Sequence, residues 1–179
     1  FHTIQPVIDQ AQSKDTVYVL NGTFSDQILI NKNIHLKGSG SSIIQPEALP
    51  QSGVYDVKLN SGSSGTTIEN LIFDFNGKND NRSGMGCSIG QASLLTRDIT
   101  LKNNIFYPGN RSGVGGIAIQ TVTNSDVSDL SIRYNKIFGN DTCNGNGIFI
   151  NPFYGPGNIE IYKNQITGNI SYGISIQTS

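Results

Sequence analysis

A short pattern recurs along this 179-residue chain at spacings of 26 to 31 residues. In each copy, a stretch of alternating apolar and polar residues is followed, after a turn, by Gly-Ile-x-Ile or a variant of it. The first stretches are residues 97–106, 128–137 and 157–166, and the second are 86–90, 116–120, 147–151 and 173–177. A unit this short cannot bury its own apolar face, so neighbouring units must stack into one continuous core.

Aligning the copies places apolar residues in register. The superposed sets are Ile99, Leu130 and Ile159; Leu101, Ile132 and Ile161; and Phe106, Ile137 and Ile166. Alternation turns these side chains inward, and equivalent residues of successive units are expected about 4.8 Å apart. Each inward Ile then contributes roughly 1.5–3 kcal/mol by leaving water. The repeat therefore predicts parallel strands stacked around aliphatic columns.

One asparagine also falls in register, as Asn104, Asn135 and Asn164. Stacked side-chain amides can bond to one another and satisfy turn groups that would otherwise be unpaired. We predict an asparagine ladder at this corner; the alternative is that these are ordinary surface turn residues.

The repeated Ile-x-[Leu/Ile]-x-x-Asn-x-[Phe/Ile] followed by Gly-Ile-x-Ile resembles the right-handed parallel β-helix superfamily, the pectin-lyase-like proteins with short parallel β-helix repeats. Residues 15–24 and 28–38 resemble its opening coils, so the resemblance covers essentially the whole chain. It implies an all-β solenoid whose coils contain three short sheets. Residues 66–73 read as another coil, although Asn70 sits one residue off the ladder register.

We expect one domain, 1–179, with a capping helix in 1–13 and coils in 14–179. In the first segment Ile4, Val7, Ile8 and Ala11 recur at helical spacing, with Thr3 as the N-cap. Residues 173–177 read as a full core strand with no capping segment after it. We therefore expect the C-terminal end to be uncapped, with the native chain continuing or another molecule covering it.

Charge and composition limit the kinds of partner and the location that we expect for this chain. The chain has 12 Lys and Arg against 13 Asp and Glu, so no basic field attracts nucleic acid. No apolar run approaches the roughly 20 residues of a membrane span, so no membrane insertion is expected. Few Lys and many Asn, Gly, Ser and Thr favour an extracellular or cell-surface location. Five Asn-x-Ser/Thr sites are glycosylation candidates: Asn21, Asn81, Asn110, Asn140 and Asn169.

The two cysteines are predicted to be free thiols. Cys87 occupies the register of Ile117, which makes it a buried apolar residue, and Cys143 lies about two coils away. That separation of about 10 Å exceeds the roughly 7 Å limit between Cα atoms for a disulfide. With His only at positions 2 and 35, no zinc signature exists and no metal site is predicted.

Outward rows are where β-helix enzymes of this kind place their active sites. One row here is Glu69, Lys102, Arg133 and Tyr162; a second is Thr100, Ser131 and Glu160; a third is Asp98, Asp129 and Asn158. These residues stabilise one another by cross-strand pairing, or they carry chemistry. For the second case, the candidate catalytic residues are Asp98, Asp129, Lys102 and Arg133.

The resemblance implies how such a set would act. Polysaccharide lyases of this superfamily neutralise a uronate, often through calcium held by carboxylates, and abstract the proton with Arg or Lys. No cofactor is predicted otherwise. The Asp trio, Gly-His-Gly and Arg-x-Lys segments of the superfamily's hydrolases are missing from the sequence, as is the pectin-esterase set. His35 points outward without an identifiable partner, as a surface histidine does.

Aromatic residues near the last coils offer a sugar-stacking platform: Phe149, Phe153, Tyr154 and Tyr162. Equally, they pack beneath the loop at 151–158.

Three hypotheses for the function of the chain result. The first is a non-catalytic extracellular module with a structural, adhesive or fibre-forming role, stacking end to end with other copies of itself. The second is a polysaccharide lyase-like enzyme acting on an acidic glycan, and the third is glycan binding without turnover.

Overall fold

The computed structural model describes residues 3–45, 55–60, 62–74, 85–89, 96–107, 117–120, 127–139, 146–151, 158–168 and 172–176. The described part is mostly β-strand, with one short helix. The elements are α1 (Gln5–Gln10), β1 (Thr16–Val19), β2 (Gly22–Phe24), β3 (Ile28–Ile30), β4 (His35–Ile44), β5 (Tyr55–Leu59), β6 (Thr67–Asp74), β7 (Met85–Ile89), β8 (Thr96–Lys102), β9 (Ile105–Tyr107), β10 (Ile117–Gln120), β11 (Val127–Arg133), β12 (Lys136–Phe138), β13 (Asn146–Asn151), β14 (Ile159–Tyr162), β15 (Gln165–Thr167) and β16 (Tyr172–Ile176).

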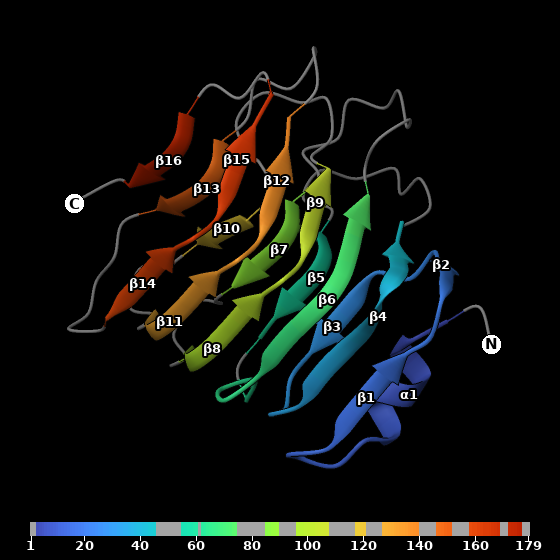
Figure 1. Ribbon diagram of the computed structural model, residues 1–179. Helices are drawn as coiled ribbons and strands as arrows, with labels where there is room; N and C mark the ends of the chain where they lie inside the picture. The colour runs from blue at the N-terminus through green and yellow to red at the C-terminus, as the bar shows by residue number, and fades with distance from the viewer. Residues whose placement is uncertain are drawn as a thin grey trace.

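The strands form two parallel sheets, and the chain alternates between them. The ten-stranded sheet has two limbs: β1, β4, β6, β8, β11 and β14 form the first, and β2, β4, β6, β9, β12 and β15 the second. The six-stranded sheet runs in the order β3, β5, β7, β10, β13, β16. In Figure 1 the colours pass in sequence order across the stack, from blue at the N-terminal end to red at the C-terminal end. Every neighbour is therefore a strand from the preceding or following repeat.

We call a layer one passage of the chain through both limbs and the six-stranded sheet, such as β8, β9 and β10. The resemblance implies three separate short sheets in each coil. Here β4 and β6 run unbroken through the corner and are hydrogen-bonded in both limbs, which joins the limbs into one sheet. The hydrogen bonding of the described strands therefore makes two sheets and not three.

The predicted apolar columns are present and extend further than the repeat indicates. Ile99 pairs with Leu130 and Leu130 with Ile159. Another column runs through every described layer, from Val17 through Leu36, Ile68, Leu101 and Ile132 to Ile161. Beside it, the Phe73 and Phe106 rings stack at 4.8 Å between centroids. These buried columns are the core, because alternation directs one side of every strand inward.

The corner between the two limbs is built by two stacked rows. The first consists of residues with positive φ: Asn70, Asn103, Tyr134 and Lys163 have φ between 53° and 59°. One left-handed residue per layer turns the chain without a glycine, at a conformational cost for each. Asn70, which is off the ladder register in the sequence, lies in this row.

The second corner row is the asparagine ladder. Asn104 Nδ2 donates to Asn135 Oδ1 at 3.2 Å, and Asn135 Nδ2 donates to Asn164 Oδ1 at 3.0 Å. The same oxygens accept the backbone N–H groups of Asn104 and Asn135. Each Nδ2 also donates to a carbonyl of the preceding layer, as Asn135 does to Leu101 at 3.0 Å. The buried corner is thus satisfied by side chains that repeat with the layers.

Helix α1 lies within the predicted capping segment, but it begins one residue later than expected. Its N-cap is Ile4 and not Thr3, and no side chain of the cap residue bonds to the helix. Asp26 instead accepts the backbone N–H groups of Ile4 and Gln5. Ile4 and Ile8 are buried as the spacing predicts, whereas Val7 is about half exposed.

The helix closes one edge of the six-stranded sheet. Gln5 Oε1 accepts the N–H of Leu29 at 2.7 Å, and Gln5 Nε2 donates to the Leu29 carbonyl at 3.1 Å. The carbonyl of Ile30, the next residue of β3, points to the opposite side and accepts the N–H of Asn60, which follows β5. The Gln5 amide therefore occupies the place of a neighbouring strand. At the other end of α1, Lys32 Nζ donates to the carbonyls of Asp9 and Ala11.

The cysteine prediction is only partly covered by the described residues. Cys87 pairs with Ile117 on one side and with Val57 on the other, so its backbone has the predicted register. Cys143 lies outside the described residues, as does the side chain of Cys87, so the free-thiol prediction stays a prediction.

Candidate functional site

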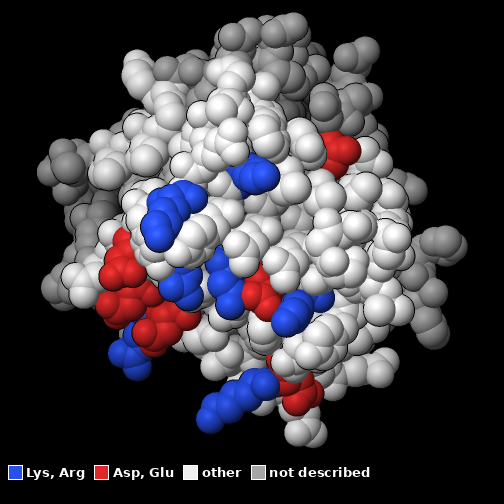
Figure 2. All heavy atoms as spheres, viewed as in Figure 1, with Lys and Arg blue, Asp and Glu red and all other residues white. Residues whose placement is uncertain are grey.

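The predicted outward row on the first limb has the expected register and is one residue longer. Glu69 pairs with Lys102, Lys102 with Arg133, and Arg133 with Tyr162. Lys37 precedes them, opposite Glu69. Figure 2 shows Lys and Arg side chains as a broken line across the middle of this view, with an acidic side chain among them and an acidic group at the left margin.

Glu69 is the centre of a cluster of bases. Its Oε2 lies 2.7 Å from Lys102 Nζ, and its Oε1 lies 3.2 Å from Lys37 Nζ and 3.1 Å from His35 Nε2. The residue is only 6% exposed. His35, predicted to be a surface residue without a partner, thus has its Nε2 close to the Glu69 carboxylate, although the two make no hydrogen bond.

The cluster holds Glu69 ionised. Burial alone would raise the pKa of Glu69, but hydrogen bonds from Lys102 and Lys37, together with the charges of Lys102 and His35, outweigh it and lower the pKa from its ordinary value. A carboxylate with a lowered pKa, engaged by two ammonium groups, is a poor proton acceptor. The cluster is suited to holding β4, β6 and β8 together across three layers.

Further along the row, a cation and two aromatic rings form a second group. Arg133 Nη1 donates to Tyr162 Oη at 2.9 Å, and this hydrogen bond raises the pKa of Arg133 above its ordinary value. The Tyr134 ring meets the Tyr162 ring edge-on at 5.7 Å, and Lys163 Nζ lies 5.3 Å from the Tyr134 ring centroid. Arg133 stays a cation at any physiological pH.

The four candidate catalytic residues do not come together in one place. Ser128 pairs with Arg97 and Leu130 with Ile99, so Asp129 lies opposite Asp98, as the rows predict. Both aspartates have positive φ and are exposed. Lys102, however, is four residues along β8 from Asp98, roughly 13 Å at the usual strand rise, and its ammonium group binds Glu69.

The acidic pair has a base beside it. Calcium takes six to eight oxygen ligands, and Arg97 Nε lies 3.9 Å from Asp98 Oδ2. Within the described ranges, no group of three or more His, Cys, Asp or Glu residues is placed to hold a metal ion. The one helix of those ranges, α1, is far too short to cross a membrane.

The candidate sugar platform is divided between the two sheets. Phe149 lies on β13, in the six-stranded sheet, while Tyr162 lies on β14, in the ten-stranded sheet. Phe153 and Tyr154 lie outside the described residues.

One of the glycosylation candidates, Asn21, is exposed beside β2. The other four lie outside the described residues: Asn81, Asn110, Asn140 and Asn169.

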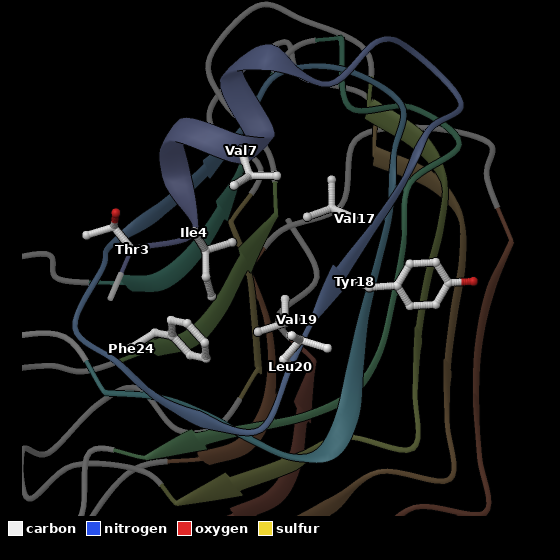
Figure 3. Close-up of a pocket in the computed structure, with 8 residues that line it drawn as sticks. All are labelled: Thr3, Ile4, Val7, Val17, Tyr18, Val19, Leu20 and Phe24. Atoms are coloured by element: carbon white, nitrogen blue, oxygen red, sulfur yellow. The ribbon is translucent and has the colours of Figure 1, made fainter. Parts of the chain in front are cut away.

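An apolar hollow of about 220 Å³ opens between α1 and the first strands. Figure 3 shows Ile4, Val7, Val17 and Val19 around it, while the Tyr18 ring points away. Phe24 lies on its far side. Among the described residues of its lining, Thr3 and Tyr18 carry side-chain hydroxyls and the others are apolar.

The opposite end of the stack exposes residues that belong to the core columns. In β13, Ile148 and Ile150 are 0% and 1% exposed. Their register partners in β16, Ile174 and Ile176, are 47% and 60% exposed, and Tyr172 in the same strand is 65% exposed. In the described sheet order β16 has a hydrogen-bonded neighbour on one side only. Among the described strands, β16 therefore presents an apolar edge.

Comparisons with protein-family models, with curated proteins and with solved structures gave no match to this chain.

Proposed function

We propose that the chain winds as a single right-handed parallel β-helix and serves as a non-catalytic extracellular or cell-surface scaffold, whose C-terminal end binds a further β-layer. The observation that carries this proposal is the exposure of Ile174 and Ile176 in β16. Both stand at positions that every preceding layer of the six-stranded sheet fills with Ile, Val, Leu or Cys.

Physical chemistry favours a bound layer at this end. Fully burying an Ile side chain is worth roughly 1.5–3 kcal/mol relative to leaving it exposed. The outer edge of β16 also presents backbone N–H and C=O groups in the geometry that a strand recognises. An added strand would satisfy both requirements, as β16 does for β13.

The described outward residues support a structural role over a catalytic one. Lys102 and Arg133, the two bases that a lyase-like reaction would use, donate to Glu69 and to Tyr162. Asp98 and Asp129 lie apart from them at a turned position of the strand. The row from Lys37 to Tyr162 therefore links neighbouring layers, and a rigid stack is the property that it supports.

The solution mass of the purified chain tests the proposal. We expect light scattering to report association that increases with protein concentration, and the Ile174→Lys and Ile176→Lys variants to remain monomeric with unchanged far-UV circular dichroism. Tyr18→Lys is the matched control, because Tyr18 is an exposed aromatic residue on β1, at the other end of the stack. A wild-type chain that stays monomeric at high concentration would contradict the proposal.

A second candidate is binding of an acidic glycan along the first limb. Lys37, Lys102 and Arg133 stand in one register row across the layers, and Glu69 offsets a single one of these charges. Titration calorimetry with pectate or alginate, and with a neutral dextran as the control, would separate this candidate from scaffolding alone. Release of an unsaturated, ultraviolet-absorbing product would instead indicate lyase activity, which remains a hypothesis.

A further inference from the structure

We infer that Asn21 carries an N-linked oligosaccharide, which covers the outer edge of the first layer beside Tyr18 and Leu20. This inference rests on the extracellular location in the proposed function, because N-linked oligosaccharides are a modification of secreted chains. It is carried by the exposure of the acceptor motif and by the edge of the ten-stranded sheet on which the motif stands.

The acceptor motif, Asn21-Gly22-Thr23, lies on the surface at the corner between β1 and β2. All three of its residues are exposed. Within the described residues, the Asn21 side chain makes no hydrogen bond. The backbone just before it is nevertheless fixed, because Ser42 Oγ donates to the carbonyls of Val19 and Leu20 at 2.7 and 2.9 Å. An exposed, unbonded amide on a fixed corner can carry a bulky group without disturbing the fold.

Strands β1 and β2 form the outer edge of the ten-stranded sheet at the N-terminal end of the stack. Among the described strands, each of the two pairs with β4 alone. Tyr18 and Leu20 are 69% and 75% exposed at this edge, and both line the apolar hollow between α1 and the first strands (Figure 3). An exposed strand edge with apolar side chains recruits other chains unless something blunts it.

Helix α1 covers the neighbouring sheet and not this edge. Its Gln5 amide bonds to both backbone groups of Leu29 on β3, the first strand of the six-stranded sheet. Within the part of the chain that the structure describes, no hydrogen bond joins α1 to β1 or β2. At this end of the stack, one sheet is therefore closed by a helix and the other carries a glycosylation motif.

Strand geometry brings the oligosaccharide close to the apolar side chains. Asn21 follows Leu20 directly and is three residues from Tyr18, at most about 10 Å along an extended strand. The C–H groups on one face of an N-acetylglucosamine ring pack against such side chains, while its hydroxyl groups stay in water. A bulky, hydrated group at this corner also leaves no room for a further strand.

The modification is a group transfer from an oligosaccharide linked to a polyprenyl pyrophosphate. A bond forms between Asn21 Nδ2 and the anomeric carbon of the first N-acetylglucosamine. The bond from that carbon to the pyrophosphate oxygen breaks, the pyrophosphate leaves with the electron pair, and Nδ2 gives up one proton. Thr23 supplies the hydroxyl that the acceptor motif requires.

Mass spectrometry of the chain secreted from a eukaryotic cell tests the occupancy of Asn21. We expect a glycosidase-sensitive oligosaccharide on the peptide that contains Asn21, and its removal should leave Asp at this position. Asn21→Gln and Thr23→Ala should abolish the modification, whereas Thr23→Ser, which keeps the hydroxyl, should retain it. An unmodified Asn21 in the secreted chain would overturn the inference.

Hydroxyl-radical footprinting, before and after enzymatic removal of the oligosaccharide, tests the covered edge. We expect oxidation of Tyr18 and Leu20 to rise roughly threefold or more on removal, because the bulky group no longer shields them. Tyr134 is the matched control, since it is an exposed aromatic residue beyond β11, and its oxidation should not change. Equal oxidation of Tyr18 before and after removal would also overturn the inference.

The two experiments are independent of the association proposed at β16. A chain that stays monomeric and carries the shielding oligosaccharide would contradict the layer-binding function and support this inference. A chain that associates through β16 with Asn21 unmodified would support the layer-binding function and overturn this inference.

Discussion

Asn104 and Asn135 are 31 residues apart in the chain, yet the Nδ2 of the first donates to the Oδ1 of the second at 3.2 Å. Asn135 also accepts the backbone N–H of Asn104 and donates to the carbonyl of Leu101. We expect Asn135→Ala to destabilise the fold by about 2–5 kcal/mol, because both backbone groups lose their partner inside the protein. Urea unfolding monitored by circular dichroism measures the change.

The loss of stability on substitution should differ between positions along the asparagine ladder. Asn164→Ala should cost less than Asn135→Ala, since Asn164 is more exposed and water replaces part of what is lost. Gln165→Ala removes a neighbouring exposed amide and should change the free energy of unfolding by no more than about 0.5 kcal/mol. Equal losses at all three positions would argue against the ladder as the source of stability.

The buried Glu69 carboxylate should make the stability of the fold sensitive to acid. Its pKa is lowered in the folded protein, so its contribution to stability is fully present above the ordinary glutamate pKa near 4.5 and is lost as the pH falls through the lowered value. We expect Glu69→Gln to be less stable than the wild type by about 1–3 kcal/mol at pH 7. The two proteins should converge in urea midpoint between pH 5 and pH 3, values chosen to bracket the glutamate range. Glu160→Gln, the same substitution at an exposed position, is the matched control.

Lys163 occupies a left-handed conformation with φ of 53°, which disfavours residues with a β-carbon. Asparagine tolerates this conformation better than lysine, and Lys163 is exposed. Lys163→Asn should therefore raise the free energy of unfolding by about 0.5–1 kcal/mol. The loss of the weak hydrogen bond from Lys163 to Tyr134 should offset part of this gain. Lys136→Asn, in the extended strand β12, should not stabilise the chain. A loss of stability at position 163 would show that the Tyr134 contact outweighs the backbone.

Gln5 should be sensitive to a change of a single atom. Gln5→Glu keeps an oxygen that accepts the Leu29 N–H but replaces the amide group that donates to the Leu29 carbonyl. We expect a loss of about 1–2 kcal/mol at pH 7, and faster amide hydrogen exchange of β3, detected by mass spectrometry. Gln10→Glu, on the same helix and exposed, is the control. Unchanged exchange in β3 would mean that α1 is held without this bridge.

The columns and the ladder could be predicted because both follow from a period in the sequence. Once strands of 26 to 31 residues' spacing stack in parallel, Ile99, Leu130 and Ile159 must superpose, and so must the asparagines. The row from Glu69 to Tyr162 followed by the same reasoning. Its extension to Lys37 did not, because the pairing of β4 with β6 contains a register shift between Lys37 and Ser42 that an alignment of repeats does not reveal.

A contact that occurs only once in the structure leaves no repeating pattern in the sequence from which it could be predicted. Gln5 reaches Leu29 across 24 residues, and nothing in either neighbourhood distinguishes this glutamine from Gln10 or Gln12. The grouping of Asp98, Asp129, Lys102 and Arg133 as one catalytic set illustrates the converse. The rows are in register, but distance along a strand and the position of Glu69 decide which side chains meet, and these separate the bases from the acids.

The amino-acid sequence alone determined that strands alternate, that like residues stack and that buried asparagines line a corner, because these properties depend only on periodicity and on which side chains leave water. Only the tertiary structure decided which charges neutralise Glu69, how α1 closes β3 and how far β16 stays exposed. These depend on distances between segments remote in the chain, which close packing sets to within an ångström and a repeat pattern does not encode.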